Sequence, residues 1–300
     1  MRRFGGWLRA NADVFLALVI AVSFGLLGVL DVLGPDDDQI VNAAILLTLA
    51  LLAATLLRDR RAVGRALIDM SSVRLVSGPD VGQAHAEARR STDRWIFKGG
   101  TGTYLRAVTL RGCVEIARQE ARPLRMQLEI IDPTDEALCE EYARFRSSLT
   151  PGPDRTGERW TRERVRKESY ATVLAACWYR QRFTFLSIEV GLYKVMSTFR
   201  WDLSSSCVIM TQEDPSGPTM IFEKDRPYYR AYSRELVASF KQARQVHVDR
   251  SDGQQLDDEP SIEETRRLFT LLGLDFPSSF TDRDVTEVIR KALQAKNPYW

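Results

Sequence analysis

The sequence has 300 residues, of which 44% are hydrophobic and 27% charged, and its formal net charge is only +2. This near-neutral charge gives no global electrostatic reason for nucleic-acid binding, so nucleic acid is not expected as a partner. Four cysteines without a CxxC pair and only two histidines offer no metal-ligand spacing, so neither a metal nor another cofactor is expected.

Two apolar runs lie near the N-terminus, at residues 14–30 and 40–57. Neither contains a charged side chain, and each is about long enough to cross a bilayer as a helix. A short acidic stretch separates them, whereas arginines precede the first run and follow the second. Because excess Lys and Arg mark the cytoplasmic side, we expect a multi-pass protein of the inner (plasma) membrane with both termini cytoplasmic and the lipid bilayer as a partner. A cleaved signal peptide for the first run, or a helical hairpin buried in a large protein, are the alternatives.

The rest of the chain is polar enough and long enough for one or two folded domains. Apolar runs at 95–97 and 126–131 predict buried strands, each followed by a helical pattern. This order predicts a βαβ unit with a parallel pair of strands. Ligands of such sheets bind outside the carboxyl ends of the strands, which places residues 98–103 and 132–135 at the expected site.

The stretch Lys98-Gly-Gly-Thr-Gly-Thr103 follows the first of these strands. Its glycines allow close backbone approach, the helix that follows offers free N–H groups, and Thr101 and Thr103 add hydroxyls. These features make a phosphate or other anion site plausible. The stretch is neither a Walker A loop nor a complete GxGxxG motif, and ordinary capping of a helix explains it as well.

Later patterns predict a helix over 160–182, strands at 183–189, 192–199, 206–211 and 219–222, and a helix over 228–246. After a polar linker, Ser261 and Thr281 begin two short amphipathic helices that need a partner surface, either the main domain or another chain. The predicted domains are a hairpin at 1–60, a juxtamembrane connector at 61–92, an α/β domain at 93–248, and a linker with a C-terminal helical extension at 249–300.

The order of elements over residues 91–246 resembles one half of a phospholipase D-like domain. The resemblance rests on the glycine stretch after residue 97, the Ile-Ile-Asp-Pro sequence at 130–133 and the paired strands around Arg200. Active members of that family carry an H-x-K-x4-D motif, in which the histidine attacks phosphorus and the lysine binds the phosphate. The corresponding turn of this sequence has Arg200-x-Asp202-x4-Cys207, and the two histidines, His85 and His247, fall in connectors.

The resemblance therefore implies a degenerate domain that has lost the phosphodiesterase chemistry. It also implies a homodimer or other homo-oligomer, because such half-domains usually pair with a second copy. The two-span arrangement is similar to that of bacterial membrane effectors and sensors of defence or signalling systems, an analogy of architecture only.

Together these features predict a membrane helical hairpin plus a cytosolic α/β domain with a mixed sheet and a small C-terminal helical extension. We expect a membrane-anchored sensor or regulatory binding protein that recognises a phosphorylated small ligand, such as a nucleotide, or a protein partner. The cleft would be lined by Lys98, Thr101, Thr103, Arg200 and Asp202. The alternatives are a membrane-disrupting effector of a defence system, or a phosphodiesterase or nuclease-like enzyme with Glu189, Asp132 and Asp202 as acid/base groups.

Overall fold

The computed structural model of the protein describes residues 73–149, 152–153, 157–214 and 217–298, together with residues 23, 45, 48, 49, 52, 55, 56, 58–60 and 63. The chain divides into two units, Met1–Ser71 and Ser72–Trp300. The elements described below all belong to the second unit.

The prediction of a membrane hairpin is corrected by the structure. Among the residues that the structure describes, no helix is long and apolar enough to cross a membrane. The two apolar runs lie almost wholly outside the described residues. The prediction rested on run lengths of 17 and 18 residues, which are at the lower limit for a membrane span. The hairpin in the fold class, the multi-pass inner-membrane location and the lipid bilayer as a partner are therefore not retained.

The second unit is built on one mixed sheet, in which eight strands are described. Their spatial order is β1-β7-β6-β5-β2-β3-β4-β8. Strands β2, β3 and β4 are parallel to one another, and every other neighbouring pair is antiparallel. The strands are β1 (Val73–Val76), β2 (Arg94–Lys98), β3 (Leu124–Ile131), β4 (Leu186–Tyr193), β5 (Phe199–Leu203), β6 (Cys207–Gln212), β7 (Thr219–Glu223) and β8 (Arg244–Val246).

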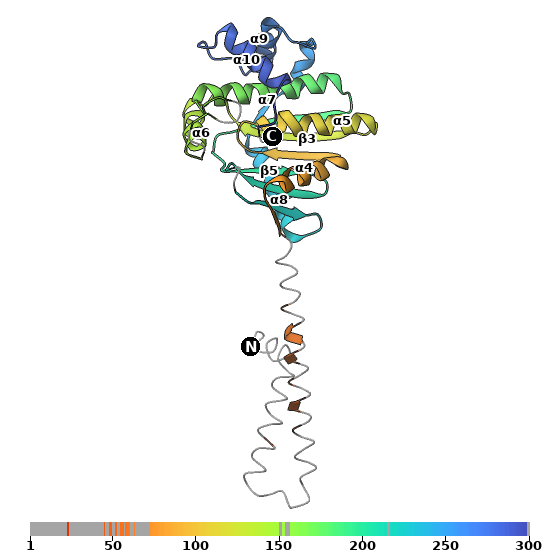
Figure 1. Ribbon diagram of the computed structural model, residues 1–300. Coiled ribbons are helices and arrows are strands. Elements are labelled where there is room, and N and C mark those ends of the chain that lie inside the picture. Colours follow the sequence, from red (N-terminus) through yellow and green to blue (C-terminus); the bar gives the residue numbers. More distant parts are fainter. Residues whose placement is uncertain are drawn as a thin grey trace, which may run out of the picture. The chain divides into compact units, whose positions relative to one another are not determined.

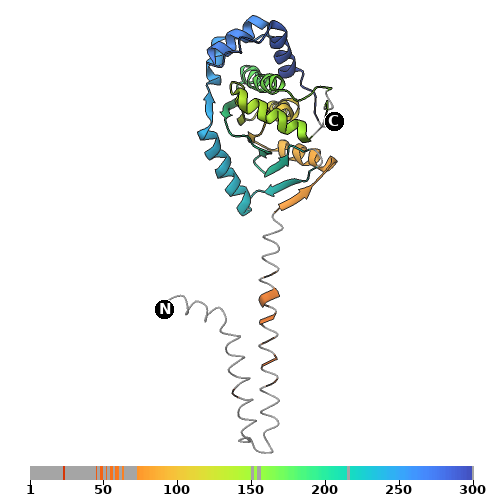
Figure 2. The same ribbon diagram turned by 90° about the vertical axis from the view of Figure 1, so that its left-hand side faces the viewer.

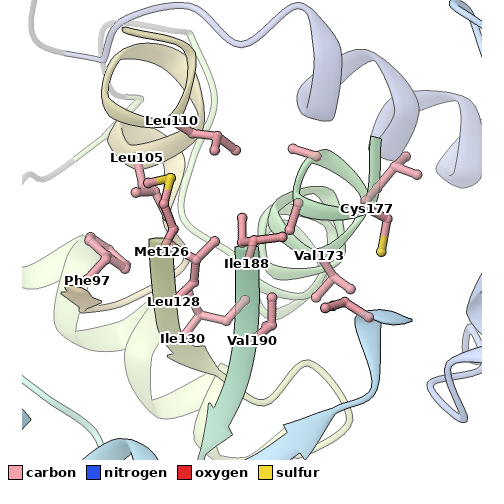
Figure 3. Close-up of a cluster of buried hydrophobic side chains, with 14 of the residues drawn as sticks. Phe97, Leu105, Leu110, Met126, Leu128, Ile130, Val173, Cys177, Ile188 and Val190 are labelled. Carbon is pink, nitrogen blue, oxygen red and sulfur yellow. The ribbon is translucent and has the colours of Figure 1, made fainter. Parts of the chain in front are cut away.

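Helices on one face of this sheet make the crossovers between the parallel strands. A π-helical segment, η1 (Leu105–Leu110), continues into α5 (Arg111–Gln119) and connects β2 to β3, while α6 (Glu136–Leu149) and α7 (Arg162–Arg182) connect β3 to β4. Alternate residues of β3 and β4, among them Leu128 and Val190, point toward η1 and α7 and form the main core (Figure 3).

The opposite face of the sheet is covered by α8 (Pro227–Gln242), which is drawn in teal in Figure 2. Here Leu236 of α8 packs on Ile96, Leu203, Val208 and Phe222. Near the starts of β3 and β4 this face carries polar side chains at alternate positions, among them Arg125, Gln127 and Glu189.

The two C-terminal helices, α9 (Ile262–Leu271) and α10 (Asp282–Leu293), lie on the outer side of α7 (Figure 1). Ser261 and Thr281 each form a complete capping box at the start of these helices. Tyr170 of α7 packs against Phe269 and Phe276 at ring-centroid distances of 5.2 and 4.8 Å. Helix α7 is consequently buried on two sides, between the sheet and the C-terminal pair.

The segment that precedes β2 also belongs to the sheet unit. Strand β1 pairs with β7 as an edge strand, and α4 (Pro79–Arg90) follows it directly. Two short elements complete the described chain: β8 pairs with β4 at the other edge, and a 3-10 turn, η2 (Val248–Gly253), leads to α9.

The main core makes a prediction about stability. Leu128 is fully buried between η1 and α7, whereas Leu75 on the edge strand is 64% exposed. We expect Leu128→Ala to lower the free energy of unfolding by about 2–5 kcal/mol, because it leaves a cavity in a packed core. The matched change Leu75→Ala should cost about 0.5 kcal/mol or less. Urea denaturation of the two variants measures the difference, and equal losses would contradict the packing described.

Candidate functional site

A cavity of 470 Å³ lies at one edge of the sheet. The carboxyl ends of β2 and β6 and the first residues of β5 and β7 meet at this edge. Two helices also begin there: α4, which starts at Pro79, and the helix that starts at Thr103 and continues into η1. The first turn of a helix has N–H groups without intrahelical partners, so the cavity wall includes two helix N-termini. In α4, Pro79 has no N–H and Asp80 adds a carboxylate to the first turn.

A row of three polar side chains crosses the floor of the cavity. Arg200 at the start of β5 is the cross-strand partner of Thr211 on β6. Met210 pairs with Met220, so the next residues outward on β6 and β7 are Thr211 and Thr219. All three polar residues line the cavity, and each is at least nine-tenths buried. We call Arg200, Thr211 and Thr219 the polar row.

The Arg200 guanidinium is held by its neighbours in one orientation. Its Nε donates to Asp202 Oδ2 at 3.0 Å, and Trp95 Nε1 donates to the other oxygen of that carboxylate at 3.1 Å. The guanidinium carbon lies 4.6 Å from the centre of the Tyr104 ring, in cation–π contact. Burial raises the pKa of Asp202, and the adjacent Arg200 opposes this shift by favouring the charged carboxylate.

His85 of α4 contacts Arg200 from the other side. Its Nε2 lies 3.1 Å from Arg200 Nη2. A guanidinium has only donors, so His85 Nε2 must accept this hydrogen bond. Burial lowers the pKa of His85 well below its ordinary value of 6.5, with Arg200 and Arg89 acting in the same direction. His85 is thus neutral, and its proton is on Nδ1.

The glycine stretch between β2 and η1 forms the wall next to the polar row. A Cβ at Gly99 would lie 2.9 Å from Arg200 Cγ, and one at Gly100 would lie 1.9 Å from the Tyr142 hydroxyl. Gly102 has φ +78°, which other residues rarely adopt. Close packing therefore requires glycine at positions 99 and 100, and the backbone conformation favours glycine at position 102.

Arginines and aromatic rings form the other end of the cavity. The guanidinium carbons of Arg146 and Arg164 lie 4.6 and 4.1 Å from the Trp160 ring centre. Glu213 accepts a hydrogen bond from the Tyr142 hydroxyl at 2.9 Å and forms an ion pair with Arg146. These contacts fix two cations beside an aromatic platform.

Several polar atoms of cavity-lining side chains are buried without a hydrogen-bond partner among the described residues. They include His85 Nδ1, Trp160 Nε1, and the hydroxyls of Thr211 and Thr219. His85 Nδ1–H and Trp160 Nε1–H are donors, and the hydroxyls can donate. A buried polar group without a partner costs about 1–3 kcal/mol, which a ligand that bonds to it would recover.

The predicted site residues divide into three groups. Thr101, Thr103 and Arg200 line the cavity. Asp202 lies behind Arg200 as its anchor. Lys98 points to the opposite face of the sheet, where it lines a separate cavity of 800 Å³ and bonds to Ser239 at 2.5 Å. The structure brings three of the five together, and their role in ligand binding stays a prediction.

Several lining residues were not singled out from the sequence. His85 was placed in a connector, but it is fully buried against Arg200. Thr211 and Thr219 each stand at the end of an apolar strand, a weak signal that many strand ends share. The sequence gives no signal that Tyr142 and Trp160 line a cavity, since an aromatic residue in a helical pattern usually indicates core.

The acid/base groups of the enzymatic alternative do not line the cavity. Asp132 accepts hydrogen bonds from Thr134 and Arg244, and Glu189 accepts one from Gln127 on the neighbouring strand. Within the described part of the chain, no three His, Cys, Asp or Glu side chains come together in a way that could hold a metal ion.

The comparisons with known proteins are sparse. No protein family matches the chain, and no curated protein matches it. One similar solved structure is that of TrmBL2, described as an archaeal chromatin protein with a novel mode of DNA binding. It is 8% identical over 70% of this chain and 71% of that one, with a TM-score of 0.32. A likeness at this level supports no argument about this protein's function.

These findings correct the phospholipase D-like resemblance. No comparison supports it, and the motif-like spacing does not produce a site. Cys207 begins β6 at the far end of the β5–β6 hairpin, whereas Arg200 pairs with Thr211 near its other end. Equal spacing in sequence was misleading because Cys207 lies away from the contact that Arg200 and Asp202 make with each other. The homodimer and the defence or signalling role rested on the resemblance or on the hairpin and are not retained.

The expectation about nucleic acid is corrected too. It rested on the near-neutral net charge, which does not describe local charge, and one similar solved structure is of a DNA-binding protein. The exclusion of nucleic acid is therefore withdrawn, although the weak likeness gives no argument for DNA binding.

The buried His85 makes a prediction about pH. Below about pH 6.5 the unfolded chain takes up a proton that folded His85 does not, so the free energy of unfolding should fall as the pH drops from 6.5 toward 5. The slope should approach 1.4 kcal/mol per pH unit at most. His85→Gln should lack this component, while the same change at exposed His247 should keep it. If the free energy of unfolding changed with pH in the same way in wild type and in His85→Gln, a buried neutral His85 would be contradicted.

Proposed function

We propose that residues 73–298 form a regulatory binding domain for a phosphorylated small molecule, and that the ligand occupies the 470 Å³ cavity. The observation that carries the proposal is the convergence of two helix N-termini on the polar row. Helix N-termini bind phosphate through free N–H groups and the helix dipole. The polar row supplies hydroxyl donors and a cation to the same cavity.

The charge and hydrogen-bonding character of the cavity favour an anion. Three arginines line it, Arg146, Arg164 and Arg200, against two acidic residues, Glu213 and Asp214. The carboxylates that pair with Arg146 and Arg200 hold them in place, so less side-chain entropy would be lost when a ligand binds. The unpartnered donors of His85 and Trp160 would favour a ligand that offers acceptors.

The dimensions and the aromatic end of the cavity favour a small molecule with an organic part. A volume of 470 Å³ lies in the range of small-molecule sites. The phosphate would lie at the polar row, and the organic part would extend toward Tyr142 and Trp160. This arrangement suits a nucleotide or a compound of similar size.

Recognition is favoured over turnover by the state of the candidate catalytic groups. His85 is neutral and already accepts a hydrogen bond from Arg200 at Nε2, and Asp202 is bonded to Arg200 and Trp95. Both groups serve to orient the Arg200 guanidinium. No specific observation favours a phosphodiesterase reaction at this cavity.

The proposal is tested by removing one unpartnered hydroxyl from the polar row. Thr219→Val in the full chain should weaken binding of inorganic phosphate, pyrophosphate or AMP about tenfold or more, because hydrogen bonds to charged groups contribute about 1.5–3 kcal/mol. The same change should leave the free energy of unfolding equal or higher, since a buried hydroxyl without a partner becomes a methyl group. Calorimetric titration and urea denaturation measure the two effects.

Thr109→Val is the matched control. The Thr109 hydroxyl is also buried without a partner among the described residues, but it does not line the cavity. It should give the same stability change with unaltered binding, and adenosine should bind less tightly than AMP. The proposal fails if none of the three phosphate probes binds the wild type, or if the Thr219 and Thr109 variants bind alike.

A further inference from the structure

A lysine of the last described helix is connected to the cavity wall through two carboxylates. Lys291 of α10 is nearly buried, and its Nζ donates to Glu168 Oε1 at 2.9 Å and to Glu158 Oε2 at 2.6 Å. Each of these carboxylates in turn contacts a residue that lines the cavity, Glu168 contacting Thr103 and Glu158 contacting Arg164. The C-terminal helix pair is thus linked to two parts of the candidate site, in each case through one carboxylate.

The first connection leads to the glycine stretch. The Thr103 hydroxyl donates to Glu168 Oε2 at 2.9 Å and lies 3.1 Å from the hydroxyl of Thr101. Arg106 forms an ion pair with the same carboxylate, and its Nε donates to the backbone oxygen of Lys291 at 3.2 Å. Burial alone would raise the pKa of Glu168, but Arg106 and Lys291 lower it to about 2, so this carboxylate is charged at neutral pH.

The second connection leads to the aromatic end. Arg164 Nε lies 3.3 Å from Glu158 Oε2, and Arg164 Nη1 donates to the backbone oxygen of Glu158 at 2.7 Å. The same guanidinium lies over Trp160. Lys291 therefore holds the carboxylate that orients Arg164 above the aromatic platform.

Docking of α10 does not require these buried charges. The helix already packs on the core through Val288, with Val285 also fully buried. On the same interface Lys167 of α7 pairs with Asp284 and Glu287 at 2.7 and 2.6 Å. A buried ion network is often no more stabilising than apolar packing of the same volume, so its value lies in the geometry that it fixes.

We propose that Lys291 is a positioning residue of the binding cavity, acting through Glu168 on Thr103 and through Glu158 on Arg164. The inference rests on the proposed function for the identity of the ligand, but not for the effect of Lys291 on the glycine stretch. Thr103 in the glycine stretch and Arg164 above the platform are therefore only in place when α10 supplies this lysine. Ligand affinity then depends on a helix that does not itself line the cavity.

The test compares Lys291→Met with Lys167→Met in the full chain. Both changes remove a lysine that joins α7 to α10, but only Lys291 reaches Glu158 and Glu168. With inorganic phosphate as the probe, we expect Lys291→Met to raise the Kd about tenfold, and Lys291→Arg to restore much of the loss. Lys167→Met should change the Kd by about twofold or less.

Hydrogen exchange of the ligand-free proteins gives a second readout. Amides of residues 101–110 should exchange about tenfold faster in Lys291→Met than in wild type, and about as in wild type in Lys167→Met. If Lys291→Met does not fold, Glu158→Gln replaces it, because that side chain is 33% exposed and contacts both Lys291 and Arg164. Exchange is then read over residues 158–166.

The two ideas fail in different ways. Absence of phosphate binding by the wild type would overturn the proposed function, while the exchange data would still decide the role of Lys291. Equal effects of Lys291→Met and Lys167→Met on exchange, or no effect of either, would overturn the positioning role. An effect on exchange without a change in the Kd for phosphate would overturn the link between α10 and the ligand.

Discussion

The arrangement of the cavity depends on the buried ion pair between Arg200 and Asp202. A guanidinium at this depth needs partners, since an isolated buried charge is strongly unfavourable. Asp202 supplies the opposite charge from the same strand face, His85 accepts from the second side, and Trp95 fixes the carboxylate. Gly99 leaves room for the arginine stem on the neighbouring strand. Arg200 belongs to the polar row and contacts both the glycine stretch and α4, so loss of the ion pair would disturb all three.

A second buried network supports the same cavity from the side of the C-terminal helices. The carboxylates of Glu158 and Glu168 receive Arg106, Arg164 and Lys291 from three separate elements. Helix α7, which carries Glu168, is buried between the sheet and α10. Its charged residues can be so deeply buried because each has a partner of opposite sign. The fold thus uses paired charges to orient groups that apolar packing alone would leave free to rotate.

The local part of this arrangement could be predicted from the sequence. Apolar runs and glycine punctuation located β2, β3 and the helix between them, and the rule for parallel sheets placed residues 98–103, with Thr101 and Thr103, at the carboxyl end of β2. Arg200 was included only through the phospholipase D-like resemblance that is corrected above. Only the first two residues of the strand predicted at 192–199 are in β4, which ends at Tyr193. The chain then turns, and β5 begins at Phe199. Lys98 lies on the other face, since neighbouring strand residues alternate and Phe97 takes the core side. His85, Thr211 and Thr219 meet Arg200 only through pairings with β1, β6 and β7, which no local pattern specifies.

The central claim is that phosphate binds between the polar row and the two helix N-termini. The most direct measurement is a crystal structure of the full chain soaked with tungstate, a phosphate mimic whose anomalous signal identifies its position without ambiguity. The account predicts tungstate within hydrogen-bonding distance of Arg200, Thr211 or Thr219. Tungstate bound only at other places, or absent from the cavity at concentrations that saturate surface sites, would contradict it.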